Sequence, residues 1–206
     1  NQAVSPDDQV RNNAPLRQET EYRDIRALIR KKSMQLQGRL SAADRWRLRA
    51  TAPGARLLQE EAAATPEIAS GSVQLTVTSP PFLDVVQYAR DNWLRCWFNG
   101  FDAEKVGQRI TMSKTVEDWE AEMAAVFAEL HRITKPGGWV AFEVGEVRRG
   151  TVKLDEIVAP IGIGAGFECA AILINAQRFT KTANIWGVKN NSLGTNSNRI
   201  VLFRKT

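Results

Sequence analysis

The chain is 206 residues long, 43% of them hydrophobic, and it carries a formal net charge of +5 at pH 7. This length predicts one domain with a sizeable buried core, and no apolar run is long enough to span a membrane, so we expect no membrane partner. One histidine and two isolated cysteines, Cys96 and Cys169, exclude a zinc site of His and Cys ligands and a disulfide framework. We therefore expect no metal and a reducing, cytoplasmic compartment.

The positive charge is concentrated near the start of the chain. Residues 1–56 hold 12 Lys or Arg against 6 Asp or Glu, a balance of +6, whereas the rest of the chain has a balance of −1. Apolar spacing predicts a helix in this region, and the helix carries the basic residues Arg30, Lys31 and Lys32. We assign 1–54 to a basic, helical N-terminal segment. It either contacts the phosphates of a nucleic acid or is an ordinary helical segment with a solvated basic face.

The remainder of the chain, 55–206, alternates between strand-like and helix-like patterns. Apolar runs predict strands at 55–59, 75–78, 139–145, 167–179 and 198–204. Apolar residues at helical spacing predict helices at 116–134 and 152–166. Lys135-Pro136-Gly137-Gly138 follows the first of these helices, and we expect it to end the helix with a glycine available for a left-handed cap. The alternation predicts an α/β fold.

The most informative segment follows the strand predicted at 75–78 and reads Ser79-Pro80-Pro81-Phe82. The two prolines donate no backbone hydrogen bonds and have fixed φ angles, so they predict a rigid turn. The carboxyl end of a buried strand is where open α/β sheets hold ligands. The Ser79 hydroxyl and the carbonyl groups of Ser79 and Pro80 remain as acceptors, with a flat apolar ring beside them. This set suits an exocyclic amino group on a planar heterocycle.

The same residues carry a resemblance to a known family. Ser79-Pro80-Pro81-Phe82 resembles the Asp/Asn/Ser-Pro-Pro-Tyr/Phe catalytic motif of S-adenosylmethionine-dependent DNA amino-methyltransferases. Serine in the first position is similar to the cytosine-N4 branch, whereas the adenine-N6 branch more often has Asp or Asn. The stretch 130–138 fits the Leu-x-Arg-x-x-Lys-Pro-Gly-Gly pattern that recurs before strand five of such enzymes. The alternative is a strand and a proline turn in an unrelated α/β protein.

The resemblance covers 55–206 and implies a Rossmann-like, seven-stranded methyltransferase sheet with an antiparallel pair, strands six and seven, at one edge. Only the later half of that sheet is clear, because strands one and two are not identified. The implied reaction moves a methyl group from S-adenosylmethionine to the exocyclic amino group of a flipped base in DNA, cytosine N4 in preference to adenine N6. Ser79, Pro80, Pro81 and Phe82 would form the catalytic site, with Phe82 stacked on the base.

The cofactor-binding part of the resemblance is incomplete. By the match, Glu61 takes the acidic position at the end of strand three and would accept a hydrogen bond from the cofactor's adenine amino group; a solvated acidic pair opening a helix is the alternative. The family's glycine-rich loop after strand one is not found, because Gly162, Gly164 and Gly166 precede a strand. We therefore expect an upstream segment or a second polypeptide to supply the cofactor half. A degenerate relative that binds without catalysing is the other possibility.

Two segments between the predicted elements are candidates for recognising a base sequence. The first, 83–115, contains Asn, Gln and Arg side chains with many aromatic residues, and packing of these aromatics in the core is the favoured interpretation. The second, the polar loop 180–198, offers Lys181, Asn184 and Trp186 as DNA-binding residues, and a solvent-exposed hairpin loop is the alternative. An RNA or protein-glutamine methyltransferase and a non-catalytic DNA-binding subunit are the competing functions.

Overall fold

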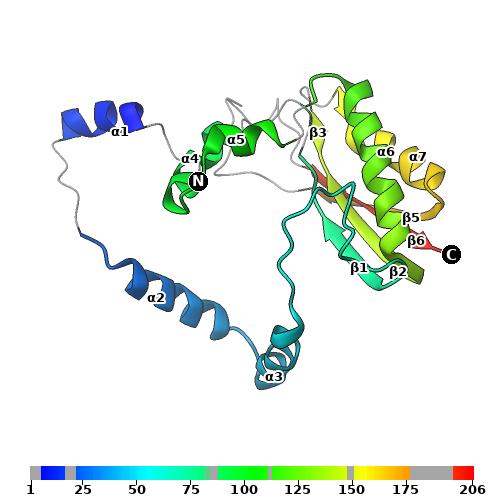
Figure 1. Ribbon diagram of the computed structural model, residues 1–206, viewed down its shortest axis with the longest axis horizontal. Coiled ribbons are helices and arrows are strands. Elements are labelled where there is room, and N and C mark those ends of the chain that lie inside the picture. The colour runs from blue at the N-terminus through cyan, green and yellow to red at the C-terminus, as the bar shows by residue number, and fades with distance from the viewer. Residues whose placement is uncertain are drawn as a thin grey trace. The chain divides into compact units, whose positions relative to one another are not determined.

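The computed structural model describes residues 6–16, 22–81, 83, 88–110, 113–147, 151–176 and 197–206. The chain divides into two compact units, Val4–Gln59 and Glu60–Thr206. Both are drawn in Figure 1, where the colour follows the chain from blue to red. The sequence boundary between 54 and 55, and the division of roles attached to it, stay predictions.

The smaller unit is a series of helices whose described side chains are mostly exposed. They are α1 (Pro6–Asn13), η1 (Ala14–Leu16), α2 (Ile25–Gln37), α3 (Ala42–Thr51) and η2 (Ala52–Gly54). Asp24 caps α2 by accepting hydrogen bonds from the backbone N–H groups of Arg26 and Ala27, at 2.9 and 3.2 Å. Ser41 and Asp44 form a capping box at the start of α3. Neither α2 nor α3 has a buried residue, so side-chain caps and not a core fix where these helices begin.

The strand predicted at 55–59 is wrong. These residues follow η2 as an irregular segment with no strand pairing. Leu57, which the strand prediction needed as a buried residue, is 99% exposed. A short extended segment is stable as a strand only when a neighbouring strand and a packed face support it. The structure provides neither at this point of the chain.

The larger unit contains a four-stranded sheet in the order β1-β2-β6-β5. The strands are β1 (Val73–Thr78), β2 (Thr134–Val144), β5 (Phe167–Ala176) and β6 (Ser197–Lys205), close to four of the predicted strands. β1 runs parallel to β2, and β6 runs antiparallel to both β2 and β5. The antiparallel β5–β6 pair therefore lies at one edge, as expected. A short antiparallel pair, β3 (Glu146–Val147) and β4 (Val152–Lys153), forms a separate sheet.

Helices α6 (Val116–Ile133) and α7 (Leu154–Gly164) lie side by side against one face of the four-stranded sheet (Figure 1). Two further helices, α4 (Tyr88–Phe98) and α5 (Ala103–Gln108), contact each other. The core centres on Phe127 of α6, whose ring lies 4.8 Å from that of Phe142 and 5.0 Å from that of Phe203. Helices and sheet therefore form a mixed α/β fold. No helix in the described part of the chain is long and apolar enough to cross a membrane.

Helix α7 is held against β6 by two contacts. The Arg199 guanidinium donates a hydrogen bond of 2.9 Å to the Asp155 carboxylate, and the side chains of both residues are largely buried. A Cβ atom on Gly162 would lie 2.2 Å from the Phe203 ring, so only glycine permits this approach of helix to strand. The helix begins at Leu154, later than the predicted 152–166, because the two preceding residues pair as β4.

The segment 135–138 does not cap α6 as predicted. The helix ends at Ile133, and Thr134 is already extended, with φ −71° and ψ 132°. The glycines instead lie inside β2, at the point where the pairing with β1 shifts register. Gly137 has φ +75°, and a Cβ atom on Gly138 would lie 2.8 Å from a backbone carbonyl oxygen. Both positions therefore need glycine for the path of the strand.

Candidate functional site

Ser79, Pro80 and Pro81 directly follow β1. Because β2 is parallel to β1, the carboxyl ends of both strands lie at the same end of the sheet. Open α/β sheets bind ligands at this carboxyl end. The structure thus brings the predicted turn to the expected end, with Pro80 and Pro81 half-buried and Ser79 exposed. Phe82 lies outside the described residues.

The turn is anchored to helix α6 by a tryptophan. The indole Nε1–H of Trp119 donates a hydrogen bond of 3.0 Å to the carbonyl oxygen of Pro81, and Trp119 is 1% exposed. Thr115 fixes the start of the helix, because its hydroxyl accepts a hydrogen bond from the backbone N–H of Asp118 at 3.1 Å. Helical spacing predicts Trp119 as a core residue. Its role as an anchor was missed, although a buried indole N–H generally needs an acceptor.

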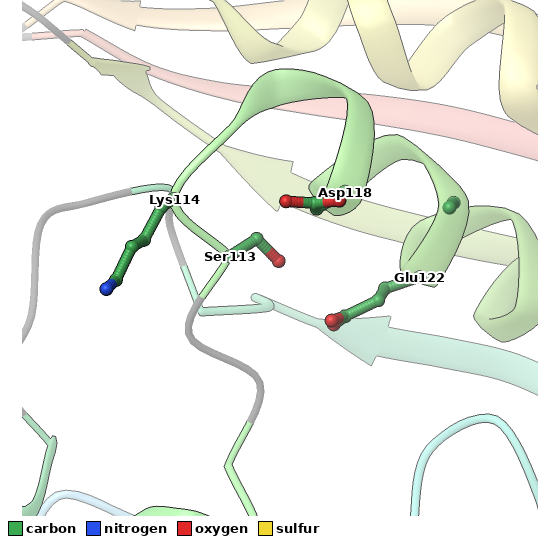
Figure 2. Close-up of a pocket in the computed structure, with 5 residues that line it drawn as sticks. Ser113, Lys114, Asp118 and Glu122 are labelled. Carbon is green, nitrogen blue, oxygen red and sulfur yellow. The ribbon is translucent and has the colours of Figure 1, made fainter.

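A cavity of about 500 Å³ opens at the same end of α6 (Figure 2). Among the described residues it is lined by Ser113, Lys114, Asp118, Ala121 and Glu122. The Ser113 hydroxyl and the carboxylates of Asp118 and Glu122 turn toward the same space, whereas Lys114 is directed away from it (Figure 2). The cavity therefore presents oxygen atoms to any bound group.

Two of these oxygens are buried without a hydrogen-bond partner among the described residues. They are Ser113 Oγ and Glu122 Oε2, and Ser113 as a whole is 9% exposed. Asp118 differs, because its carboxylate accepts a hydrogen bond of 2.6 Å from the Thr115 hydroxyl. The motifs of the sequence point to none of the residues that line the cavity. The spacing of Asp118 and Glu122, four residues apart on a predicted helix, was an available signal for the carboxylate pair, but no pattern pointed to Ser113.

The structure does not reproduce the expected setting of Glu61. This residue is exposed and forms an isolated bridge with Ala64 in a turn, since the strand that should precede it is not formed. The turn is tied to α6 instead: the Thr65 backbone N–H donates 2.7 Å to Glu129, and Arg132 donates 2.9 Å to the Thr65 carbonyl. Glu61 as a cofactor-binding residue stays a prediction.

The described residues do not form a fitting site for S-adenosylmethionine. Binding of the methionine end needs a turn of glycines that lets the backbone approach the ligand closely. None of the strands that the structure describes is followed by a glycine-rich turn of this kind. The part of the chain that the structure describes thus lacks the glycine-rich turn expected for the methionine end of the methyl donor.

The predicted DNA-binding residues fall into two groups. Arg30, Lys31 and Lys32 are exposed on α2, in the smaller unit. Lys181, Asn184 and Trp186 lie outside the described residues. Their contact with DNA stays a prediction in both cases.

No family model matches the sequence, and no curated protein sequence matches it. Several solved structures are similar to part of this chain. A protein from Thermus thermophilus, provisionally described as a DNA modification methylase, is 21% identical over 66% of this chain and 46% of that chain, with a TM-score of 0.41. The same protein has been crystallised in complex with S-adenosyl-L-methionine, and this structure matches with 21% identity over 66% and 47% of the two chains and a TM-score of 0.39.

Two further matches are methyltransferases. The cytosine-N4-specific PvuII DNA methyltransferase is 13% identical over 68% of this chain and 44% of that chain, with a TM-score of 0.44. An S-adenosylmethionine-dependent methyltransferase from Methanosarcina mazei is 10% identical over 80% and 78% of the two chains, with a TM-score of 0.38. The chain spans about half the length of the Thermus and PvuII proteins. At these identities and TM-scores the matches do not decide the chemistry of this chain.

Proposed function

We propose that this chain carries the base-binding half of a DNA amino-methyltransferase. Its substrate would be the exocyclic amino group of a flipped base in DNA, cytosine N4 in preference to adenine N6, and S-adenosylmethionine would supply the methyl group. The observation that supports this most is the Ser79-Pro80-Pro81 turn at the carboxyl end of β1, fixed by the hydrogen bond from Trp119. A cytoplasmic location and contacts of α2 with DNA phosphates belong to the same proposal.

The turn is suited to hold an amino group by its protons. In this proposal the Ser79 hydroxyl and the Pro80 carbonyl accept hydrogen bonds from the two N–H protons. They thereby favour a more tetrahedral nitrogen, whose lone pair is less delocalised into the base ring. The prolines keep these acceptors in place before the base arrives, and preorganised dipoles of this kind contribute much of an enzyme's rate. Flipping the base costs a few kcal/mol. Stacking on Phe82, worth about 1–3 kcal/mol, would offset part of that cost.

The open edge of β1 agrees with a sheet that is completed by further strands. Among the described strands β1 pairs only with β2, so its other edge is unpaired. Leu75 and Val77 are 57% and 73% exposed, so the described part of the chain also leaves the apolar face of β1 uncovered. In the seven-stranded sheet of the resemblance, strands one and two would continue from this edge and carry the cofactor half. We propose that an upstream segment or a second polypeptide supplies them, and that Glu61 adds at most one contact to the cofactor.

The proposal is tested by replacing Ser79 with alanine in an enzyme assembled with its cofactor half. Because Ser79 is assigned to the target amino group, Ser79→Ala should lower methyl transfer to DNA strongly, about 100-fold by analogy with the loss of one preorganised oxyanion donor, while S-adenosylmethionine affinity stays nearly constant. Radiolabel transfer and cofactor binding are measured on the same variant. Ser72→Ala, an exposed serine beyond the opposite end of β1, is the matched control. An equal loss of transfer and cofactor binding would contradict the assignment.

A further inference from the structure

Two unsatisfied polar atoms share the cavity at the N-terminal end of α6. Leaving a buried donor or acceptor without a partner is costly, and native proteins usually avoid it or use it. Here both Ser113 Oγ and Glu122 Oε2 are buried and lack a partner in the described part of the chain, and both residues line one cavity (Figure 2). Its volume of about 500 Å³ leaves room for a small planar group, and the cavity is open to solvent. A ligand in this cavity would supply the hydrogen bonds that the two atoms lack.

The Ser113 hydroxyl and the Glu122 carboxylate differ in which hydrogen bonds they can form. A serine hydroxyl can donate one hydrogen bond, whereas an ionised carboxylate can only accept. Ser113 and Glu122 together offer one donor and one acceptor in the same cavity. The complementary ligand has an N–H donor next to an acceptor nitrogen on one planar edge. Cytosine has this edge in its N4 amino group and N3, and adenine in its N6 amino group and N1. Uracil and thymine have the reverse order at position 4 and N3, so in the orientation that cytosine would take a carbonyl oxygen faces the carboxylate.

The cavity also lies at the carboxyl end of β1 and β2, where the Ser79-Pro80-Pro81 turn lies. Helix α6 leads directly into β2, so the start of the helix is at the carboxyl end of β2. Trp119, which precedes Glu122 by three residues in this part of the helix, donates a hydrogen bond to the Pro81 carbonyl oxygen. The cavity residues and the Ser79 turn are thus attached to one stretch of helix.

We propose that this cavity is a subsite for the amino-bearing edge of a second nucleobase, cytosine or adenine, next to the flipped target base, and that Ser113 and Glu122 select this edge. The inference rests on the proposed function for its substrate class, but it concerns residues outside the Ser79-Pro80-Pro81 turn. Asp118 contributes negative charge at the rim, and its carboxylate is already held by Thr115.

The test is a titration of the full chain with cytidine, adenosine and uridine, followed by calorimetry or by ligand-observed NMR. Cytidine or adenosine, or both, should bind at least about tenfold more tightly than uridine, as expected for one correctly matched pair of hydrogen bonds. The cytidine and adenosine arms decide which of the two bases the cavity takes.

Two variants test the assignment of the edge. The amide of Glu122→Gln can donate as well as accept, so the preference over uridine should fall toward about onefold. Ser113→Ala should weaken binding of the preferred nucleoside several-fold, and it should leave the fold intact because Ser113 Oγ has no partner among the described residues. Glu120→Gln is the matched control, because it makes the same change at an exposed position of the same helix. It should leave the preference unchanged.

The outcomes separate this inference from the proposed function. Equal binding of uridine by the unmodified chain, or no binding of cytidine and adenosine at millimolar concentration, overturns the subsite. Loss of binding in Ser79→Ala with no change in Glu122→Gln places the nucleoside at the turn; it overturns the subsite and leaves the proposed function standing. A preference that follows Glu122 in an assembled enzyme that transfers no methyl group supports the subsite and overturns the proposed function.

Discussion

At the scale of single residues, Trp119 has two roles in the larger unit. Its ring is buried in the core of the larger unit, and its N–H fixes a carbonyl oxygen of the Ser79-Pro80-Pro81 turn. The prolines cannot tie the turn to the sheet with N–H groups of their own. The position of the turn therefore depends on acceptors such as the Pro81 carbonyl and on the donors that reach them.

Replacing Trp119 with phenylalanine keeps an aromatic ring and removes the N–H group. The lost hydrogen bond and the smaller ring should lower the free energy of unfolding by about 1–3 kcal/mol. In an assembled enzyme, kcat for methyl transfer should fall more than DNA affinity, since the turn is misplaced while other DNA contacts remain. Urea unfolding and single-turnover kinetics check this. Trp97→Phe, at a position that is 69% exposed, is the control. A loss of stability with unchanged kcat would show that Trp119 only packs the core.

At the scale of elements, helix α6 connects the features of the larger unit. One stripe of the helix is buried against the sheet: Trp119, Met123, Phe127, Leu130 and Ile133. Its first turns hold the Ser79-Pro80-Pro81 turn and line the cavity. Its last turns hold the segment before β1 through Glu129 and Arg132. A displacement of this helix would therefore alter both the proposed base-binding turn and the path of the chain that leads into β1.

The network at the end of α6 has a pH dependence that can be measured. Hydrogen bonds from Arg132, and then from Thr65, lower the pKa of Glu129 from 4.5 to about 2. A carboxyl group with a lowered folded-state pKa stabilises the fold fully above its unfolded pKa, and this contribution is lost as the pH falls from about 4.5 toward about 2. Glu129→Gln should remove the contribution, at a cost of about 1 kcal/mol at neutral pH, a value reduced for the partial exposure of Arg132.

Chemical denaturation across this pH range tests the assignment. The free energy of unfolding should fall more steeply with decreasing pH in the unmodified protein than in Glu129→Gln. The exposed Glu120→Gln provides the control, and its slope should match that of the unmodified protein. Parallel slopes for all three proteins would mean that Glu129 does not carry the linkage.

At the scale of the whole molecule, the sequence predicts elements well where local pattern and burial agree. The helical stripe of α6 and the apolar runs of β2 and β6 are such cases, because each element buries apolar residues that its pattern indicates. The strand at 55–59 was wrong because its apolar residues remain in solvent. The role of Gly137 and Gly138 depends on pairing with β1, which local turn chemistry does not reveal. The cavity could not be predicted from the sequence, because the chain before α6 brings Ser113 to the same cavity as Glu122, and no local pattern predicts the course of that segment.

The last prediction at this scale concerns binding of the methyl donor to the whole chain. The 206 residues alone should show no measurable S-adenosylmethionine binding and no methyl transfer. Glu61 is exposed in a turn and offers one hydrogen bond, about 0.5–1.5 kcal/mol net. Micromolar affinity requires about 8 kcal/mol. Calorimetry on the chain alone, and with a segment or partner that supplies strands one and two, should detect binding only in the second case. Micromolar binding by the isolated chain would contradict this division and direct the search for the cofactor site to residues 1–54.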